Sequence, residues 1–171
     1  TTGETPTLTP EEKREVLRVA KEENAGRLPL VVGIGGNNTA AVVKAIAECD
    51  TEGVDAILSV VPYYNRPAQR GIYEHYAAIA RSTQLPIILY NVPSRTGTNM
   101  LPETTLALAR DFDNIVAVKE ASGNIEQITQ LISERPKGFN IISGDDSLAI
   151  PVIEAGGEGV ISVAANAFPE H

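Results

Sequence analysis

The segment Ile115-Val116-Ala117-Val118-Lys119 runs directly into Glu120-Ala121-Ser122-Gly123. Consecutive apolar residues, mostly β-branched, are typical of a strand buried on both faces, as in a parallel sheet covered by helices. A lysine at the carboxyl end of such a strand is unusual, because lysine is rarely buried without a partner or a function. The alternative is a lysine whose stem lies along apolar surface while its ammonium reaches water. The segment therefore predicts a buried strand that ends in a residue of possible chemical importance.

Apolar segments of this kind alternate with helix-like segments along the whole chain. Successive expected strands lie roughly 20 to 30 residues apart, the length of one βα unit. The start of the first helix is marked by Thr9-Pro10-Glu11-Glu12, which combines an N-cap, a proline and a capping-box glutamate. The expected strands are Leu30–Gly33, Ala56–Val60, Pro86–Tyr90, Ile115–Lys119, Asn140–Ser143 and Gly159–Val163. The expected helices are Pro10–Asn24, Thr39–Thr51, Gln69–Ser82, Pro102–Arg110, Asn124–Glu134 and Ser147–Glu154.

Distinctive polar residues follow the carboxyl ends of these strands. An open doubly wound sheet and a closed (β/α)8 barrel both fit the alternation, but the even spacing and these polar residues favour the barrel, where they form one ring. We therefore expect an α/β fold: a single domain over residues 1–171 that is a partial (β/α)8 TIM barrel, without the first βαβ segment and the C-terminal helices. The ring would contain Gly35-Gly36-Asn37, Tyr63-Tyr64-Asn65, Tyr90-Asn91, Lys119-Glu120, Gly144-Asp145 and Ala165-Asn166.

Composition limits the possible partners and the compartment. The chain has a formal net charge of -8, which argues against nucleic acid or an anionic membrane as a partner. Its one cysteine, Cys49, cannot form an internal disulfide, as expected for a reducing, cytoplasmic compartment. No apolar stretch approaches the length of a membrane span.

Several residues near strand ends suggest chemistry. A partly desolvated Lys119 could lose its proton near neutral pH and form a Schiff base with a carbonyl substrate. Arg95 lies in a short loop after Tyr90 and suits the recognition of a carboxylate, although a surface arginine in a tight turn is the alternative. The pair Tyr63-Tyr64 could relay protons or pack against a subunit. Asp145-Asp146 has no histidine nearby, so we expect a helix N-cap there and no metal site.

The chain resembles a known family through several motifs in order and at matching intervals. The resemblance is to dihydrodipicolinate synthase (4-hydroxy-tetrahydrodipicolinate synthase), in the pyruvate-dependent class I aldolase superfamily, and it runs along the whole chain. The motifs that carry it are Thr1-Thr2-Gly3-Glu4, Pro62-Tyr63-Tyr64-Asn65-Arg66-Pro67, Tyr90-Asn91-Val92-Pro93-Ser94-Arg95-Thr96-Gly97, Val118-Lys119-Glu120-Ala121-Ser122-Gly123, Ser143-Gly144-Asp145-Asp146 and Gly159-Val160-Ile161-Ser162-Val163.

The resemblance implies a lyase of lysine (diaminopimelate) biosynthesis that condenses pyruvate with L-aspartate-4-semialdehyde to 4-hydroxy-tetrahydrodipicolinate. It implies that Lys119 forms the Schiff base with pyruvate and that Tyr90 is the general acid and base beside it. Thr2 and Tyr64 would complete a hydroxyl relay for protons. In a homodimer or homotetramer, Tyr64 would reach across an interface into a neighbour's site.

The remaining implied site residues bind substrate. Arg95 would hold the carboxylate of the aldehyde substrate, and Thr1, Gly144 and Ile161 would shape the pyruvate pocket. The resemblance implies no metal and no cofactor, because the covalent Schiff base on Lys119 serves that purpose.

Two alternatives stay open at the level of sequence. An N-acetylneuraminate lyase-like enzyme or a 2-keto-3-deoxy acid aldolase would share the lysine and the tyrosine but differ in the residues for the second substrate. A catalytically inert fragment of the synthase would carry the same motifs without an assembled site. The Thr1-Thr2, Tyr63-Tyr64 and Ser94-Arg95-Thr96-Gly97 segments favour the synthase.

Overall fold

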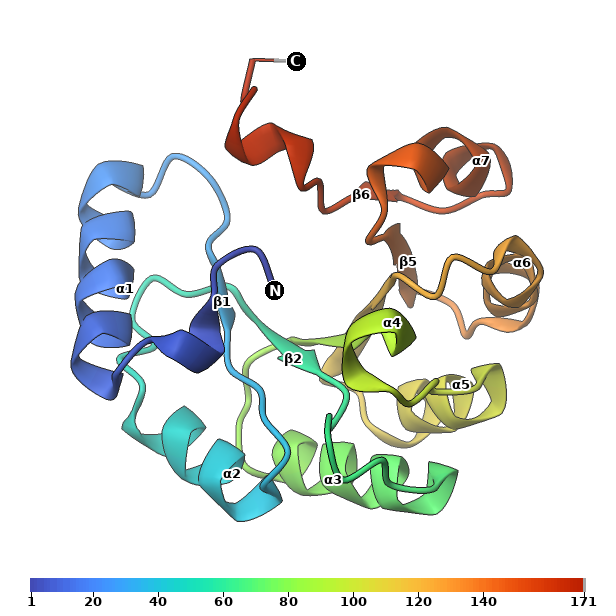
Figure 1. The fold of residues 1–171 in the computed structure, drawn as a ribbon, viewed down its shortest axis with the longest axis horizontal. Helices are drawn as coiled ribbons and strands as arrows, with labels where there is room; N and C mark the ends of the chain where they lie inside the picture. The colour runs from blue at the N-terminus through green and yellow to red at the C-terminus, as the bar shows by residue number, and fades with distance from the viewer. Residues whose placement is uncertain (171) are drawn as a thin grey trace.

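In the computed structural model, which describes residues 1–170, six parallel strands form one curved sheet (Figure 1). Its order is β1-β2-β3-β4-β5-β6, so that every strand pairs with its neighbours in sequence. A doubly wound sheet would reverse direction at one point, and this order does not. The expected partial barrel is therefore confirmed. The strands are β1 (Val31–Gly33), β2 (Ala56–Val60), β3 (Ile87–Asn91), β4 (Ile115–Glu120), β5 (Asn140–Ser143) and β6 (Gly159–Val160).

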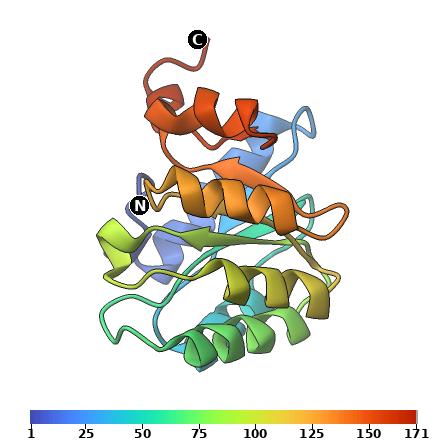
Figure 2. The ribbon, with the colours of Figure 1, turned by 90° about the vertical axis from the view of Figure 1, so that its right-hand side faces the viewer.

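Helices α1, α2, α3, α5, α6 and α7 lie along the outer, convex side of this arc, and the N-terminus lies on its concave side (Figure 1), while Figure 2 shows the arc from the side. None of the helices within residues 1–170 is long and apolar enough to cross a membrane. The α-helices are α1 (Pro10–Asn24), α2 (Thr39–Glu48), α3 (Gln69–Arg81), α4 (Pro93–Thr96), α5 (Pro102–Asp111), α6 (Ile125–Glu134) and α7 (Ala149–Glu154). Short 3-10 turns occupy η1 (Thr5–Thr7), η2 (Asp146–Leu148) and η3 (Ala164–Asn166).

The strands present different side chains to the two sides of the sheet, because successive residues of a strand point to opposite faces. The larger apolar cluster fills the space between the sheet and the helices; Ile57, Leu89 and Val118 contribute to it from three strands. Two smaller clusters lie on the concave face. They are centred on Ala56, Ile88 and Ala117, and on Tyr90, Val92 and Ala121. The second of these lies at the carboxyl ends of β3 and β4, where barrel enzymes place their sites.

Helix α1 begins as the sequence predicts. The Thr9 hydroxyl accepts a hydrogen bond from the Glu12 main-chain N–H at 3.2 Å, and the Glu12 carboxylate accepts one from the Thr9 N–H at 2.7 Å. None of its residues is buried, however, and a groove of about 590 Å³ lies between α1 and the elements β1 and α2. Local capping, more than burial, therefore defines this helix.

Most boundaries lie within two residues of those expected, and the larger differences concern α2, β6 and α4. Helix α2 ends at Glu48, because Cys49 already has extended backbone. Strand β6 ends at Val160, because the Asp146 carboxylate accepts hydrogen bonds from the main-chain N–H groups of Val163 and Ala164 and turns the chain away from the sheet. Helix α4 was expected as a loop, since four residues are too few to show helical periodicity.

Candidate active site

Lys119 and Tyr90 lie side by side at the carboxyl ends of β4 and β3. The two residues are register partners in the sheet, and both side chains are buried on the concave face, with relative exposures of 8% and 7%. The Lys119 Nζ lies 4.4 Å from the centre of the Tyr90 ring. The strand pairing alone thus places the expected Schiff-base amine against the expected acid and base.

Gly144 leaves room for the lysine stem. A Cβ atom at this position would lie 2.7 Å from the Ala121 Cβ and 3.1 Å from the Lys119 Cε. The first separation is shorter than real Cβ contacts, so any side chain here would displace Ala121 or Lys119. The glycine expected at the pyruvate pocket is therefore in direct contact with the lysine side chain.

Burial dominates the electrostatics of Lys119. Loss of solvent lowers the pKa of its ammonium, because the charged form is the one that water stabilises. The carboxylates of Asp145 and Asp146 act in the opposite direction and to a smaller extent. The shift therefore favours the free amine, which is the nucleophilic form.

The hydroxyl of Thr1 contacts the Tyr90 phenol. Its Oγ1 lies 3.4 Å from the Tyr90 phenolic oxygen, within hydrogen-bond reach. The family resemblance implied the relay role for Thr2 and a pocket role for Thr1. The structure instead brings Thr1, and not Thr2, to the tyrosine, since neighbouring residues of one turn point in different directions.

Arg95 projects from α4, a single helical turn that begins at Pro93 and is followed by Gly97 as its C-cap. Gly97 has a φ of 72°, a left-handed conformation that glycine adopts with little strain. The Arg95 side chain is exposed. The Arg95 guanidinium and the Lys119 ammonium both lie within electrostatic reach of the Thr1 main-chain nitrogen. The positive charges of Lys119 and Arg95 therefore lie near the same part of the concave face.

Tyr64 is presented to solvent by a strained loop. Its φ is 73°, which is unusual for a bulky residue, and its relative exposure is 86%. The loop is fixed to the preceding βα connection: the Asn37 side chain donates to the Tyr63 carbonyl, and the Asn65 side chain donates to the Asn37 carbonyl, both at 3.1 Å. Tyr64 is therefore held away from Tyr90 of its own chain.

Two other expected residues have mainly structural surroundings. Ile161 is half-buried, and its N–H donates to the Ser143 carbonyl at 2.9 Å, which continues the sheet beside Gly144. Asp145 occupies the expected N-cap position, at the start of η2, although its side chain makes no capping hydrogen bond. The adjacent Asp146 instead holds the turn after β6, as described above.

A buried polar cluster lies behind the lysine, and it includes Asn91 and Glu120, which were expected in the ring of the site. Glu120 and Asn91 follow Lys119 and Tyr90 directly, so they point to the opposite, helix-covered face, and both are 1% exposed or less. The Asn91 Nδ2 donates to the Glu120 Oε1 at 2.9 Å. Strand alternation was the signal that could have placed them on the helix-covered face, because it predicts two adjacent buried polar residues that need partners.

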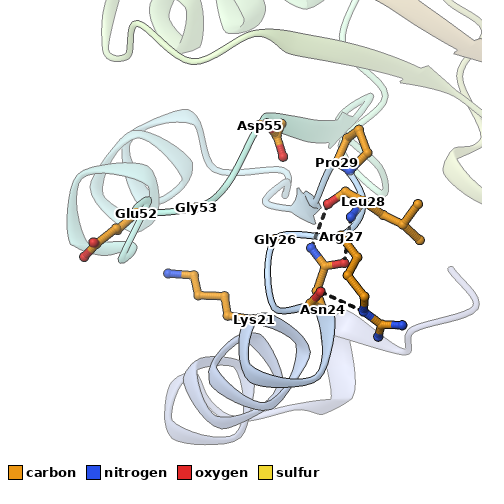
Figure 3. Close-up of a pocket in the computed structure, with 9 residues that line it drawn as sticks. All are labelled: Lys21, Asn24, Gly26, Arg27, Leu28, Pro29, Glu52, Gly53 and Asp55. Atoms are coloured by element: carbon orange, nitrogen blue, oxygen red, sulfur yellow. Dashed lines mark hydrogen bonds between the residues drawn. The ribbon is translucent and has the colours of Figure 1, made fainter.

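A separate hollow of about 450 Å³ lies at the opposite, amino ends of β1 and β2 (Figure 3). Its polar groups hold the connection from α1 to β1. The Asn24 side chain donates to the Leu28 carbonyl and accepts from the Leu28 N–H, while Arg27 donates to the Asn24 carbonyl. Asp55 accepts from the Leu30 N–H at 2.7 Å. This end of a barrel serves stability, and the contacts agree with that role.

Comparisons with known proteins agree with this geometry. A model described as the dihydrodipicolinate synthetase family matches residues 1–171. The 4-hydroxy-tetrahydrodipicolinate synthase of Parabacteroides distasonis is 58% identical over 169 residues, which cover 99% of this chain and 57% of that protein. The synthase of Bacillus subtilis is 49% identical over 166 residues, which cover 97% of this chain and 57% of that protein.

Solved structures give the same result. The dihydrodipicolinate synthase of Aquifex aeolicus superposes with a TM-score of 0.94 at 45% identity, covering 98% of this chain and 57% of that one. The chloride-inhibited synthase of Acinetobacter baumannii, solved in complex with pyruvate, has a TM-score of 0.94 at 40% identity, covering 99% and 58%. The chain thus spans a little more than half the length of these relatives. It belongs to the dihydrodipicolinate synthetase family.

Proposed function

We propose that the protein condenses pyruvate with L-aspartate-4-semialdehyde, through a Schiff base on Lys119, as a 4-hydroxy-tetrahydrodipicolinate synthase. The observation that carries this proposal is a buried lysine amine, with a pKa lowered by desolvation, against the ring of Tyr90 on the concave face. The family membership and the 58% identity to a synthase support it. We assign the activity to the intact protein, since the chain spans 57% of that relative.

The first chemical step uses the free amine of Lys119. It attacks the pyruvate keto carbon, the carbonyl oxygen leaves as water, and the uptake of one proton leaves a protonated imine. This cation withdraws electrons from the adjacent methyl group, so a proton can leave the methyl and an enamine forms. The enamine carbon then attacks the aldehyde carbon of the second substrate, whose oxygen takes up a proton, and the imine on Lys119 forms again. The amino group of the second substrate adds to this imine carbon and Lys119 leaves as the free amine, which closes the ring of the product. The buried position of Lys119 assists the first step because it favours the neutral amine.

The proton transfers need a group at the reacting carbon, and we assign Tyr90 to this position. A phenol has an ordinary pKa of about 10, so it exchanges protons near neutral pH only with help from its neighbours. Thr1 offers that help with its hydroxyl 3.4 Å from the phenolic oxygen. We therefore give Thr1 the relay role that the resemblance implied for Thr2, and leave Thr2 to the pocket.

Arg95 would bind the carboxylate of the aldehyde substrate. A guanidinium forms paired hydrogen bonds with a carboxylate, and α4 presents it on the exposed side of the same region as Lys119. The substrate aldehyde would then lie between the arginine and the enamine. Gly144 and Ile161 would border the pyruvate itself.

Tyr64 would act in the site of a second copy of the chain. An aromatic side chain that is 86% exposed on a strained, fixed loop is suited to contact with another subunit. In a symmetric dimer each copy would then complete the relay of its partner. We accordingly propose a homodimer as the smallest active unit, with a homotetramer as a pair of such dimers.

The choice of aldehyde separates the synthase from the sugar-acid aldolases. We expect the intact protein to consume pyruvate with L-aspartate-4-semialdehyde and not with N-acetylmannosamine or glyceraldehyde. Lys119→Arg keeps the charge but cannot form the imine, and should lower the rate at least about 10³-fold. An assay that follows the loss of pyruvate measures both the preference for the aldehyde and the rate of the Lys119→Arg variant. Faster turnover of a sugar aldehyde, or an active Lys119→Arg variant, would contradict the proposal.

The two threonines give a paired test of the relay. Thr1→Val removes the hydroxyl beside Tyr90 without changing the shape of the side chain, and we expect kcat to fall about 10²-fold, the usual range for lost acid–base assistance. Thr2→Val is the matched control and should affect kcat much less. Steady-state kinetics of the two variants decide the assignment, and a larger loss in Thr2→Val would reverse it.

Mixing two inactive variants tests the role of Tyr64. Tyr64→Phe and Lys119→Ala copies each lack one part of the site. In a mixed dimer, one site would combine Lys119 from one copy with Tyr64 from the other. After equal mixing and exchange of subunits, about half of the dimers are mixed and half of their sites are complete, so about one quarter of wild-type activity should return. Activity that stays at the level of the separate variants would show that Tyr64 does not act across an interface.

A further inference from the structure

The outer face of β3 and β4 carries a polar pair directly behind the reactive pair. Asn91 and Glu120 are register partners, as Tyr90 and Lys119 are one position earlier. Because side chains alternate along a strand, Tyr90 and Lys119 face the concave side while Asn91 and Glu120 face the helices. The proposed mechanism uses the first pair and gives no role to the second.

The Glu120 carboxylate receives hydrogen bonds from three different parts of the fold. Its Oε1 accepts from the Asn91 Nδ2 of β3 at 2.9 Å and from the Ser122 main-chain N–H after β4 at 3.0 Å. Its Oε2 accepts from the Gln127 Nε2 of α6 at 3.4 Å. All three partners are donors, as an acceptor-only carboxylate requires. One buried side chain thus ties two strands and a helix together.

The same network holds the segment that follows α4. The Asn91 side chain accepts from the Met100 main-chain N–H at 3.0 Å and donates to the Asn99 Oδ1 at 2.8 Å. The Asn99 Nδ2 in turn donates to the Gln127 Oε1 at 2.8 Å. Met100 is fully buried, and Asn99 lies four residues after Arg95. The carboxylate therefore anchors, through Asn91, the segment that directly continues the helical turn of the exposed arginine.

The side chains around Glu120 are uncharged. Asn91 faces it from β3, Asn99 belongs to the network after α4, and Gln127 faces it from α6. Among neighbouring ionisable groups, Lys119 points to the opposite face of β4 and Glu126 on α6 is exposed. Burial raises the pKa of Glu120 to about 7, and the hydrogen bonds from Ser122, Asn91 and Gln127 oppose this shift only in part.

We propose that Glu120 is a positioning residue for the reaction: through Asn91, Gln127 and Asn99 it sets the place of the Arg95 segment relative to Lys119. The inference rests on the proposed function, because it assigns Arg95 and Lys119 to the two substrates. An anchored segment loses less conformational freedom when the substrate carboxylate binds, so it binds more tightly. The ionised carboxylate accepts all three hydrogen bonds, whereas the neutral acid is a weaker acceptor of them, so the anchor is weaker below its pKa.

The test compares Glu120→Gln with the control Glu126→Gln, which makes the same change on the exposed side of α6. In Glu120→Gln of the intact protein we expect borohydride trapping of pyruvate on Lys119 to persist, while the KM for the aldehyde substrate rises about tenfold. In the wild type and in Glu126→Gln, this KM should fall as the pH rises through about 7, and in Glu120→Gln that inflection should be absent. A wild-type KM with an unchanged inflection in Glu120→Gln would overturn the proposal.

A second variant tests the proposal even if Glu120→Gln does not fold. Asn99→Ala breaks the link on the far side of the network and leaves Glu120 in place. It should raise the KM for the aldehyde by a similar factor while the inflection near pH 7 remains. An unchanged KM in Asn99→Ala would overturn the proposal independently.

Hydrogen exchange separates this inference from the function on which it rests. The main-chain N–H of Met100 donates a hydrogen bond to the Asn91 side chain. A weaker anchor should therefore speed amide hydrogen exchange in residues 93–101 about fivefold in Glu120→Gln, and not in Glu126→Gln. Failure of the wild type to trap pyruvate would refute the proposed function and leave this readout intact. Unchanged exchange in Glu120→Gln would refute the anchor itself.

Discussion

The desolvation of one amine is the constraint on which the site depends. Lys119 is the last but one residue of the buried strand β4, so its stem is enclosed by the sheet while its nitrogen lies over the ring of Tyr90. An ammonium in such a place loses hydration, which shifts the balance toward the free amine. Gly144 makes this enclosure possible, because any side chain there would overlap its neighbours. The reactivity of the lysine is therefore a consequence of close packing.

The two faces of β3 and β4 have different roles: one carries the reacting side chains, and the other carries the polar side chains that position them. Tyr90 and Lys119 occupy the concave face, and Asn91 and Glu120 occupy the face covered by helices. The reacting groups thereby share their main chain with a hydrogen-bonded network that reaches α6 and the segment after α4. A shift in the network must move the strand ends, because neighbouring residues of a strand cannot move independently.

The sequence was sufficient to predict much of this arrangement. Continuous apolar segments at even spacing predicted the parallel strands and their order, and the strand that ends in Lys119 predicted the buried amine. Which hydroxyl reaches Tyr90 could not be predicted, since Thr1 and Thr2 differ only in the direction that one turn gives them. The short helix α4 was missed because four residues are too few to show a helical period. The early end of β6 was missed because it depends on hydrogen bonds to Asp146, a residue far away in the sequence.

Trapping of the pyruvate imine with borohydride tests the central claim most directly. The intact wild-type protein should gain a reduced pyruvyl group on Lys119 alone, located by peptide mapping. Gly144→Ala should lose at least about nine tenths of this adduct, because the added methyl group displaces the lysine stem. Gly33→Ala is the matched control, since a Cβ there meets nothing within 4 Å, and it should trap as the wild type does. A wild type without the adduct on Lys119 would contradict the account.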